Sequence, residues 1–316
     1  MRPDGSTNGR LTSPRRPLQA LDVNDARPTA APASAARPLI TVLLPLKDYH
    51  RVYLARALNS VLTQTSPRWE LLVISERSRL SEHTDVLGSV LDDPRVRMVP
   101  RESPKLAGAL NTGMRNAATE FTAILLGDDM WAPQAVDVLT RGVERSPGID
   151  VFHSSRVIVD ENDTAISTVR RAREFTLDEF VNGSQAKHLL CWRREVGLAI
   201  GGVDETLDSV GPDDYDFPWS MAEAGARFQP VSDVLYFHRD HRDCFRLTTH
   251  LPFDVHVRAL RRIHEKHGAD PDRSEAALAQ ARATYLRQCL YRSRADRWVK
   301  ERLGYDAHRG VRLSYR

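Results

Sequence analysis

The sequence is poor in cysteine and has no long apolar run. Three cysteines, Cys191, Cys244 and Cys289, stand far apart among 316 residues, and no CxxC pair occurs. This spacing argues against a structural zinc site and a disulfide framework, so a reducing cytoplasm is the expected compartment. No stretch approaches the roughly 20 consecutive apolar residues that span a bilayer, and residues 1–30 lack the apolar segment of a signal peptide. We therefore expect a cytoplasmic protein, at most peripheral at the inner face of a membrane.

Charge is unevenly distributed along the chain, although its net value is only +3. Residues 281–316 hold ten basic and three acidic side chains, a net +7, and residues 1–37 hold six arginines and three aspartates, a net +3. The residues between them therefore carry −7. The basic C-terminal segment could contact anionic lipid, a phosphorylated acceptor or a second copy, although a solvated helix face is the simpler interpretation. No nucleic-acid motif accompanies the charge, so we expect no nucleic-acid partner.

The N-terminal half begins with an irregular segment and then becomes periodic. Residues 1–37 are rich in Pro, Ala, Ser and Arg, which predicts a disordered leader. Residues 39–44 form an apolar strand, the apolar residues between 52 and 62 recur at helical spacing, and residues 69–74 form a second apolar strand. This βαβ pattern predicts a parallel sheet with a right-handed crossover.

The remaining elements are predicted from the same patterns. We expect strands over 96–99 and 121–126, helices over about 108–118 and 136–143, a hairpin over 150–169, a short helix opened by a capping box of Thr176 and Glu179, and amphipathic helices over 253–263 and 274–300. The last helix could pair with a partner chain in a homodimer, although packing against the core is the simpler account.

Two adjacent aspartates follow the apolar strand that ends near residue 126. Carboxylate oxygens suit Mg²⁺ or Mn²⁺, and ligands gather at the carboxyl ends of strands in α/β proteins, so Asp128 and Asp129 are candidates for holding a metal-bound phosphate. The alternative is that one of them caps the next helix, which Pro133 would open. The first interpretation makes the chain an enzyme candidate.

Five ordered motifs between residues 38 and 241 resemble the inverting glycosyltransferases of family 2, which have the GT-A fold. They are ITVLLP at 40–45, LNSVLTQT at 58–65, AGALNTG at 107–113, DDMWAP at 128–133, and WRR at 192–194 followed by GGVDE at 201–205. The resemblance implies a Rossmann-like mixed α/β sheet, a nucleotide-diphosphate sugar donor, most simply a UDP-sugar, and a carbohydrate, lipid-linked or small-molecule acceptor. We expect a leader (1–37), a GT-A domain (38–250, with a nucleotide-sugar half 38–131 and an acceptor half 132–250) and a basic helical extension (251–316).

The resemblance also implies a catalytic base and a metal site. DDYDF at 213–217 is similar to the family's EDxDL motif, in which the second acidic residue is the base, here Asp214. Helix capping is the alternative account of Asp213 and Asp216, because aspartates are favoured near a helix N-terminus. YFHRDH at 236–241 is similar to a Y-x-x-R-x-H stretch, whose histidine ligates the metal or touches the diphosphate, so Mg²⁺ or Mn²⁺ is expected at Asp128 with His241.

The chemistry explains these residue types, because a base must take the acceptor's proton while a cation and basic side chains stabilise the departing diphosphate. The residues implied for the donor are Pro45, Leu46, Glu76, Lys105, Asn111, Asp128 and Arg239. Those implied for supporting or acceptor roles are Asp129, Asp213, Trp192 and His238. Lys105 could equally be a solvated loop residue, and core packing is at least as good an account of Trp192.

Three departures from the family pattern leave alternatives open. Leu126 replaces the first aspartate of the metal motif, SERS at 75–78 replaces DDGS, and Leu110 replaces an arginine. A catalytically silent GT-A domain that binds a nucleotide sugar or glycan, or scaffolds a partner enzyme, is therefore the second hypothesis. Retention of Asp214 argues against it. A nucleotidyltransferase is the third, and residues 45–51 lack the Gly-rich loop that it needs.

Overall fold

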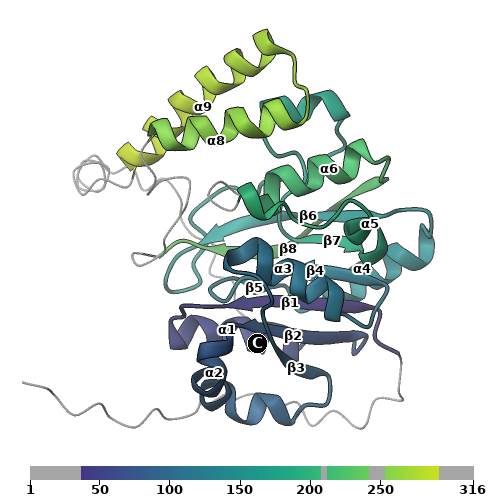
Figure 1. Ribbon diagram of the computed structural model, residues 1–316. Helices are drawn as coiled ribbons and strands as arrows, with labels where there is room; N and C mark the ends of the chain where they lie inside the picture. The colour runs from purple at the N-terminus through teal and green to yellow at the C-terminus, as the bar shows by residue number, and fades with distance from the viewer. Residues whose placement is uncertain (1–36, 208–211, 242–252, 292–316) are drawn as a thin grey trace, which may run out of the picture.

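The computed structural model describes residues 37–207, 212–241 and 253–291, so almost all of the predicted leader and the end of the predicted C-terminal extension lie outside the described residues. One mixed sheet runs through the described chain, with strand order β3-β2-β1-β4-β7-β6-β8-β5 (Figure 1). The strands are β1 Ile40–Leu46, β2 Trp69–Ser75, β3 Val96–Pro100, β4 Phe121–Ile124, β5 Met130–Trp131, β6 Val151–Val159, β7 Leu190–Arg193 and β8 Phe228–Arg239.

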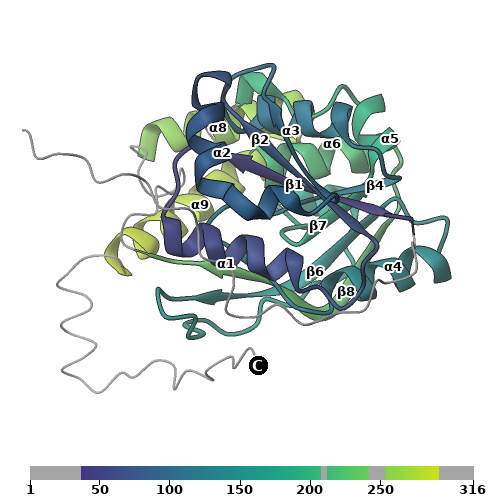
Figure 2. The ribbon, with the colours of Figure 1, turned by 90° about the horizontal axis from the view of Figure 1, so that it is seen from below.

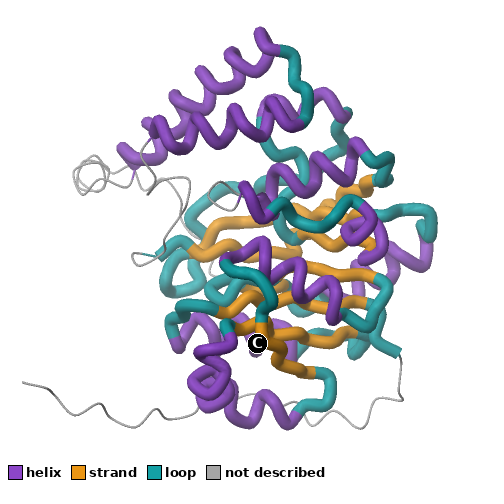
Figure 3. Tube along the Cα trace, viewed as in Figure 1, coloured by secondary structure: helices purple, strands orange, loops and turns teal. Residues whose placement is uncertain are grey.

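The first four strands of this order are parallel and carry almost continuous apolar sequence. Every residue of β2 and all but one of β1 is buried, as expected for parallel strands that helices cover on both faces. One face packs against α1 Arg51–Leu62, α2 Leu80–Leu87 and α4 Ala135–Arg145, and the other against α3 Lys105–Asn116, α5 Arg194–Ala199 and α6 Phe217–Glu223 (Figures 2 and 3). The carboxyl ends of β1, β2 and β4 therefore meet at one edge of the sheet.

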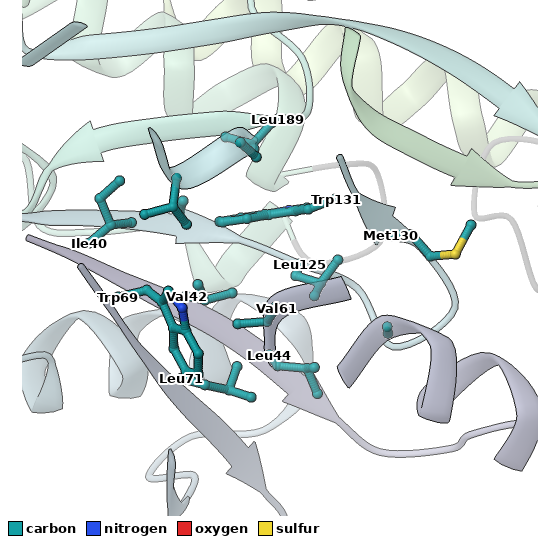
Figure 4. Close-up of a cluster of buried hydrophobic side chains, with 14 of the residues drawn as sticks. Ile40, Val42, Leu44, Val61, Trp69, Leu71, Leu125, Met130, Trp131 and Leu189 are labelled. Atoms are coloured by element: carbon teal, nitrogen blue, oxygen red, sulfur yellow. The ribbon is translucent and has the colours of Figure 1, made fainter. Parts of the chain in front are cut away.

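The apolar core behind this edge holds the segment that leads to the two aspartates. Leu125 and Trp131, on either side of them, are buried against Leu44 of β1 and Val61 of α1 (Figure 4). Burying a leucine or a larger apolar side chain stabilises the fold by about 2–3 kcal/mol. The loop 126–129 is thus anchored at both ends by the core.

Two helices follow the sheet, α8 Phe253–Lys266 and α9 Pro271–Tyr291, and they pack on the α6 side of the molecule (Figure 1). A third apolar cluster joins them to the domain through Ile263, Trp219 and Phe180. His264 links the two helices to the domain, because its ring nitrogens lie 2.7 Å from Ser274 Oγ and 2.9 Å from Tyr215 Oη.

Most predicted elements are confirmed, with shifted ends. The capping box of Thr176 and Glu179 opens a 3₁₀ turn, Leu177–Asn182, and the hairpin is present as antiparallel bridges from β6 to Ala165 and Arg170. The structure adds α2, which the sequence patterns did not predict, and β1 continues through Pro45. Among the described residues, no helix has the length and apolar character needed to cross a bilayer.

Candidate active site

Asp129 is a fully buried carboxylate that fixes the loop after β4. Its Oδ2 accepts a hydrogen bond from Tyr236 Oη at 2.6 Å and lies 3.3 Å from His238 Nδ1, while its Oδ1 accepts from the backbone N–H of Arg239 at 2.7 Å. Burial alone would raise the pKa of Asp129, but the attraction of His238 and these hydrogen bonds outweigh burial and lower it. Asp129 is therefore an anchored anion with no exposed surface.

Arg239 is fully buried beside this loop, and the structure gives it a role other than the predicted diphosphate contact. Its Nε donates to the carbonyl oxygen of Asp128 at 2.9 Å, its Nη1 donates to the carbonyl of Asp160 at 2.7 Å, and its Nη2 pairs with Asp163 Oδ1 at 2.5 Å. The guanidinium also lies over the ring of Tyr53, 4.7 Å from the centroid. Arg239 thus holds the Asp128 backbone to the hairpin.

Asp128 and His241, the two predicted metal ligands, lie together. Asp128 Oδ2 is 3.3 Å from His241 Nε2, and the Asp128 side chain is 33% exposed. The imidazole packs against Tyr53 at 4.8 Å, and its buried Nδ1 has no hydrogen-bond partner among the described residues. The charged oxygen of Asp128 therefore faces a ligand more readily than that of Asp129.

These two side chains fit a divalent cation that is held mainly by substrate. No group of three or more His, Cys, Asp or Glu side chains is placed to hold a metal in the part of the chain that the structure describes. Mg²⁺ commonly binds through one or two carboxylates together with substrate phosphates and water, and Mn²⁺ prefers similar oxygen ligands. Asp128, with His241 beside it, meets that requirement.

The predicted nucleotide contacts of β1 and β2 lie at the same sheet edge. Leu46 is paired in register with Ser75, and Glu76 follows directly. Leu46 is buried in the core, Pro45 is partly exposed, and Glu76 forms a 2.8 Å ion pair with Arg101. Of these predicted contacts, Pro45 and Glu76 have exposed surface near the carboxyl ends of the strands, whereas Leu46 is part of the core.

Asn111 and Lys105 of α3 lie in contrasting surroundings. The buried Asn111 amide donates to the carbonyl of Val203 at 2.9 Å and to Glu205 Oε1 at 3.0 Å, and its oxygen accepts from the Val203 N–H at 2.8 Å. Asn111 therefore ties α3 to the 201–205 turn. These hydrogen bonds engage the amide group that was predicted to contact the donor. Lys105 is exposed and has a φ of +63°, which is uncommon for a residue other than glycine.

Asp214 lies in a π-helical turn, Pro212–Asp216, at the start of α6. Its side chain is partly exposed, and its carbonyl oxygen accepts a hydrogen bond from Ser184 Oγ. Asp216 is only 1% exposed and pairs with Lys266 Nζ and His267 Nε2, both at 2.9 Å. The side chain of Asp213, another predicted site residue, lies outside the described part of the structure.

The end of α8 holds this turn in place. Lys266 also reaches Asp204 at 3.0 Å, His267 Nδ1 is 2.8 Å from Glu223, and the His267 ring stacks on Trp219 at 4.2 Å with an interplanar angle of 6°. Burial opposes but does not cancel the effect of the two carboxylates, which raise the pKa of Lys266. The proposed base therefore depends on residues more than fifty positions along the chain.

Trp192, one of the predicted acceptor residues, is fully buried and packs edge-on against Phe217. The core-packing alternative is therefore the one that the structure shows. Sequence reasoning did not single out Tyr53, Lys266 or His267, because each acts through a partner far along the chain, Arg239 for Tyr53 and Asp216 for the other two.

Comparison with known proteins agrees with this architecture. Residues 41–196 match the family model described as Glycosyl transferase family 2. The chain is 24% identical over 245 residues (73% of this chain, 19% of the relative) to the O-antigen biosynthesis protein RfbC of Myxococcus xanthus. It is 31% identical over 101 residues (32% of this chain, 39% of the relative) to the UDP-Glc:alpha-D-GlcNAc-diphosphoundecaprenol beta-1,3-glucosyltransferase WfgD of Escherichia coli. The chain thus spans 19% to 39% of the length of these relatives.

Solved structures share the fold. The S. aureus TarS 1–349 complex with UDP-GlcNAc superposes with a TM-score of 0.54 at 16% identity, covering 86% of this chain and 76% of that one. The structure of S. aureus TarS superposes with the same TM-score at 17% identity, covering 82% of this chain and 44% of that one. At this identity the likeness establishes the common sheet and helix arrangement.

Proposed function

Because this chain carries a family 2-like glycosyltransferase domain with the GT-A fold, we propose that it transfers a sugar from a nucleoside diphosphate sugar to an acceptor hydroxyl with inversion. The observation that carries this is the placement of two partly exposed carboxylates. Asp128 lies beside His241 and next to the buried Asp129. Asp214 lies in the turn before α6, near the buried Asp216. Burial lowers the pKa of Arg156, and Asp214 and Asp129 both oppose that effect, which supports a common site for the two positions. The UDP-sugars named for WfgD and the TarS complex favour a UDP-sugar donor.

In this mechanism Asp214 accepts the proton of the acceptor hydroxyl. The oxygen then attacks the anomeric carbon, and the bond from that carbon to the diphosphate oxygen breaks. Mg²⁺ or Mn²⁺, held by Asp128 and His241 together with the diphosphate, would neutralise the charge that develops on the leaving group. General base catalysis of this kind contributes about 10²–10⁴-fold in rate.

The surrounding residues act by fixing positions. Asp129, Tyr236 and the Arg239 backbone hold the loop that presents Asp128. Asp216, Lys266 and His267 hold the turn that presents Asp214. A misplacement of about 1 Å can cost about 10²-fold in rate, so these contacts matter without touching the substrate.

A silent GT-A domain that binds a nucleotide sugar or glycan is the second candidate. It is favoured by Leu126 in place of a metal-binding aspartate, and by the hydrogen bonds that already engage Asn111 and Arg239. This candidate predicts nucleotide binding without turnover. The partial exposure of Asp214, which a binding protein does not need, supports the enzyme instead.

Calorimetric titration of UDP, GDP and dTDP, with and without Mn²⁺, tests the donor site. The comparison uses the wild type, Asp128→Ala and a matched control, Asp85→Ala, which removes an exposed carboxylate of α2. We expect UDP to bind in a Mn²⁺-dependent way, with at least tenfold weaker binding in Asp128→Ala and unchanged binding in the control. Failure of all three nucleotides to bind the wild type would contradict the proposed function.

A further inference from the structure

Near their carboxyl ends, the paired strands β6 and β8 have one buried face and one partly exposed face. In β6, Val157 and Val159 are buried in the core, whereas Ile158 between them is partly exposed. The two strands are parallel here, and Ile158 is paired in register with His238. Paired residues of neighbouring strands lie on the same face of a sheet, and successive residues of one strand lie on opposite faces. His238, whose side chain is 23% exposed, therefore shares the face of Ile158, which we call the open face.

The open face lies between the proposed donor and acceptor sides of the site. The buried carboxylate of the loop after β4 contacts it at His238. Tyr236, two residues before His238, lies on the same face, and its ring packs against the ring of His188 with 5.4 Å between the centroids. Ser184, in the same segment as His188, donates a hydrogen bond from its hydroxyl to the carbonyl oxygen of Asp214. Contacts of the open face thus lead to the donor loop in one direction and to the turn of the proposed base in the other.

A buried carboxylate fixes the orientation of the His238 ring. Asp129 Oδ2 lies 3.3 Å from His238 Nδ1 and also accepts a hydrogen bond from the hydroxyl of Tyr236, while its Oδ1 accepts from the backbone N–H of Arg239. Because Asp129 is an anion that only accepts, the proton of its contact with His238 belongs to Nδ1. The other ring nitrogen, Nε2, is on the opposite edge of the ring and points away from Asp129. In the neutral ring Nε2 carries the lone pair that accepts a hydrogen bond.

The charge behind the ring decides which part of the donor His238 suits. An anionic phosphate oxygen in front of Nε2 would face the negative charge of Asp129 across the ring, which is unfavourable. A sugar hydroxyl is neutral and can donate its proton to the lone pair of Nε2. During transfer with inversion, the sugar also lies between the leaving diphosphate and the attacking hydroxyl, which is the position of the open face. The sugar is therefore the better partner.

We propose that His238 binds a hydroxyl group of the transferred sugar through Nε2, with Asp129 as the group that orients its ring. This inference rests on the proposed function and adds a residue that determines which sugar is transferred. A site built to hydrogen-bond a substrate hydroxyl discriminates against an analogue that lacks it, because the polar group of the site is then left unpaired. The sugar contact is separate from the diphosphate contact that is assigned to Asp128 and His241.

The test compares two variants that each keep one edge of the ring. His238→Asn keeps an N–H near the position of Nδ1 and removes Nε2, whereas His238→Gln keeps a polar group near the position of Nε2 and removes Nδ1. Asp233→Asn changes an exposed residue of the same strand and is the control. UDP, UDP-glucose and UDP-N-acetylglucosamine are titrated calorimetrically into the full chain with Mn²⁺ and without acceptor. Thermal unfolding of each variant is recorded in the same buffer.

We expect His238→Asn to bind the preferred UDP-sugar about tenfold more weakly than the wild type does, as for one lost hydrogen bond, with UDP binding within about twofold. His238→Gln should show the same sugar-specific loss but a smaller one, of about threefold, and the control should bind as the wild type does. If His238→Asn fails to fold, the sugar-specific loss in His238→Gln is the test.

Equal losses for UDP and the UDP-sugar would assign His238 to the diphosphate and overturn the inference. A larger loss in His238→Gln than in His238→Asn would also overturn it, because that order is expected if His238 only supports Asp129. Unchanged UDP-sugar binding in a folded variant that still binds UDP would contradict this inference alone. Absence of nucleotide binding in the wild type would instead contradict the proposed function.

Discussion

The two aspartate pairs of the candidate site are built alike but are held by different parts of the chain. In each, one carboxylate is almost completely buried, Asp129 or Asp216, and the other, Asp128 or Asp214, is partly exposed. Asp129 is held by β8, a strand of the same sheet, whereas Asp216 is held by the end of α8. The proposed donor side is therefore held within the sheet, whereas the proposed acceptor side depends on the C-terminal helices.

The largest expected effect is the loss of transfer activity when the proposed base, Asp214, is replaced. Asp214→Asn should lower the rate of transfer by about 10³-fold, because the variant cannot accept a proton, while the affinity for UDP stays within about twofold. Initial rates of UDP release and UDP titration measure the two quantities. Unchanged turnover in Asp214→Asn would break the assignment of the base.

We expect each buried aspartate to act by positioning the exposed aspartate of its own pair. Asp216→Asn frees the turn that carries Asp214, so we expect turnover to fall by about 10²-fold with little change in UDP affinity. Asp129→Asn frees the loop that carries Asp128, so weaker UDP binding should dominate. Steady-state kinetics and titration on both variants provide the comparison. The same pattern of loss in both would remove the distinction between donor and acceptor sides.

Substitutions in α8 test whether the acceptor side depends on that helix. The His267 side chain is 1% exposed and lies between Asp216 and Glu223. His267→Gln should therefore lower activity more than Lys266→Gln does. The Lys266 side chain is 36% exposed, so solvent screening limits its loss of stability to about 1 kcal/mol or less. Arg258→Gln removes an exposed ion pair of the same helix and is the matched control. Equal rates in all three variants would contradict the coupling.

The smallest expected effect lies at the extremes of pH. The pKa of Asp129 is lowered from its ordinary 3.8, so its stabilisation is complete above that value and is lost as pH falls through its folded pKa. The pKa of Lys266 is raised from 10.5, so its stabilisation is complete below that value and is lost as pH rises through its folded pKa. The difference in unfolding free energy between wild type and Asp129→Asn should therefore shrink only in acid. The corresponding difference for Lys266→Gln should shrink only in alkali, and any other order would contradict these signs.

Apolar periodicity and capping motifs predicted those strands and helices whose conformation depends on neighbouring residues in the sequence. The strands 40–46 and 69–75 and the helix between them follow from apolar periodicity, and the capping box of Thr176 and Glu179 needs only four residues. Helix α2 was not predicted, because one of its three buried residues is His83, which gives no regular apolar stripe. The Nδ1 atom of its buried imidazole lies 2.6 Å from Ser75 Oγ, a contact with β2 that no local pattern predicts.

The roles of the site residues were less predictable, because burial depends on partners far along the chain. The Asp-Asp motif did not show which carboxylate is buried, since the deciding hydrogen bond comes from Tyr236, 107 residues later. The charge of Arg239 suggested a ligand contact, but the guanidinium forms an ion pair with Asp163 in the hairpin. The contact between Asp216 and His267 spans 51 residues and has no local signature.

The most direct test of this division between buried and exposed carboxylates is urea unfolding of four single variants, Asp128→Asn, Asp129→Asn, Asp214→Asn and Asp216→Asn. Breaking a buried charge pair costs about 3–5 kcal/mol, so the Asp129 and Asp216 variants should lose about 3 kcal/mol of unfolding free energy. The Asp128 and Asp214 variants should lose less than about 1 kcal/mol, as partly exposed groups do. Equal losses in all four, or larger losses in the Asp128 and Asp214 variants, would contradict the account.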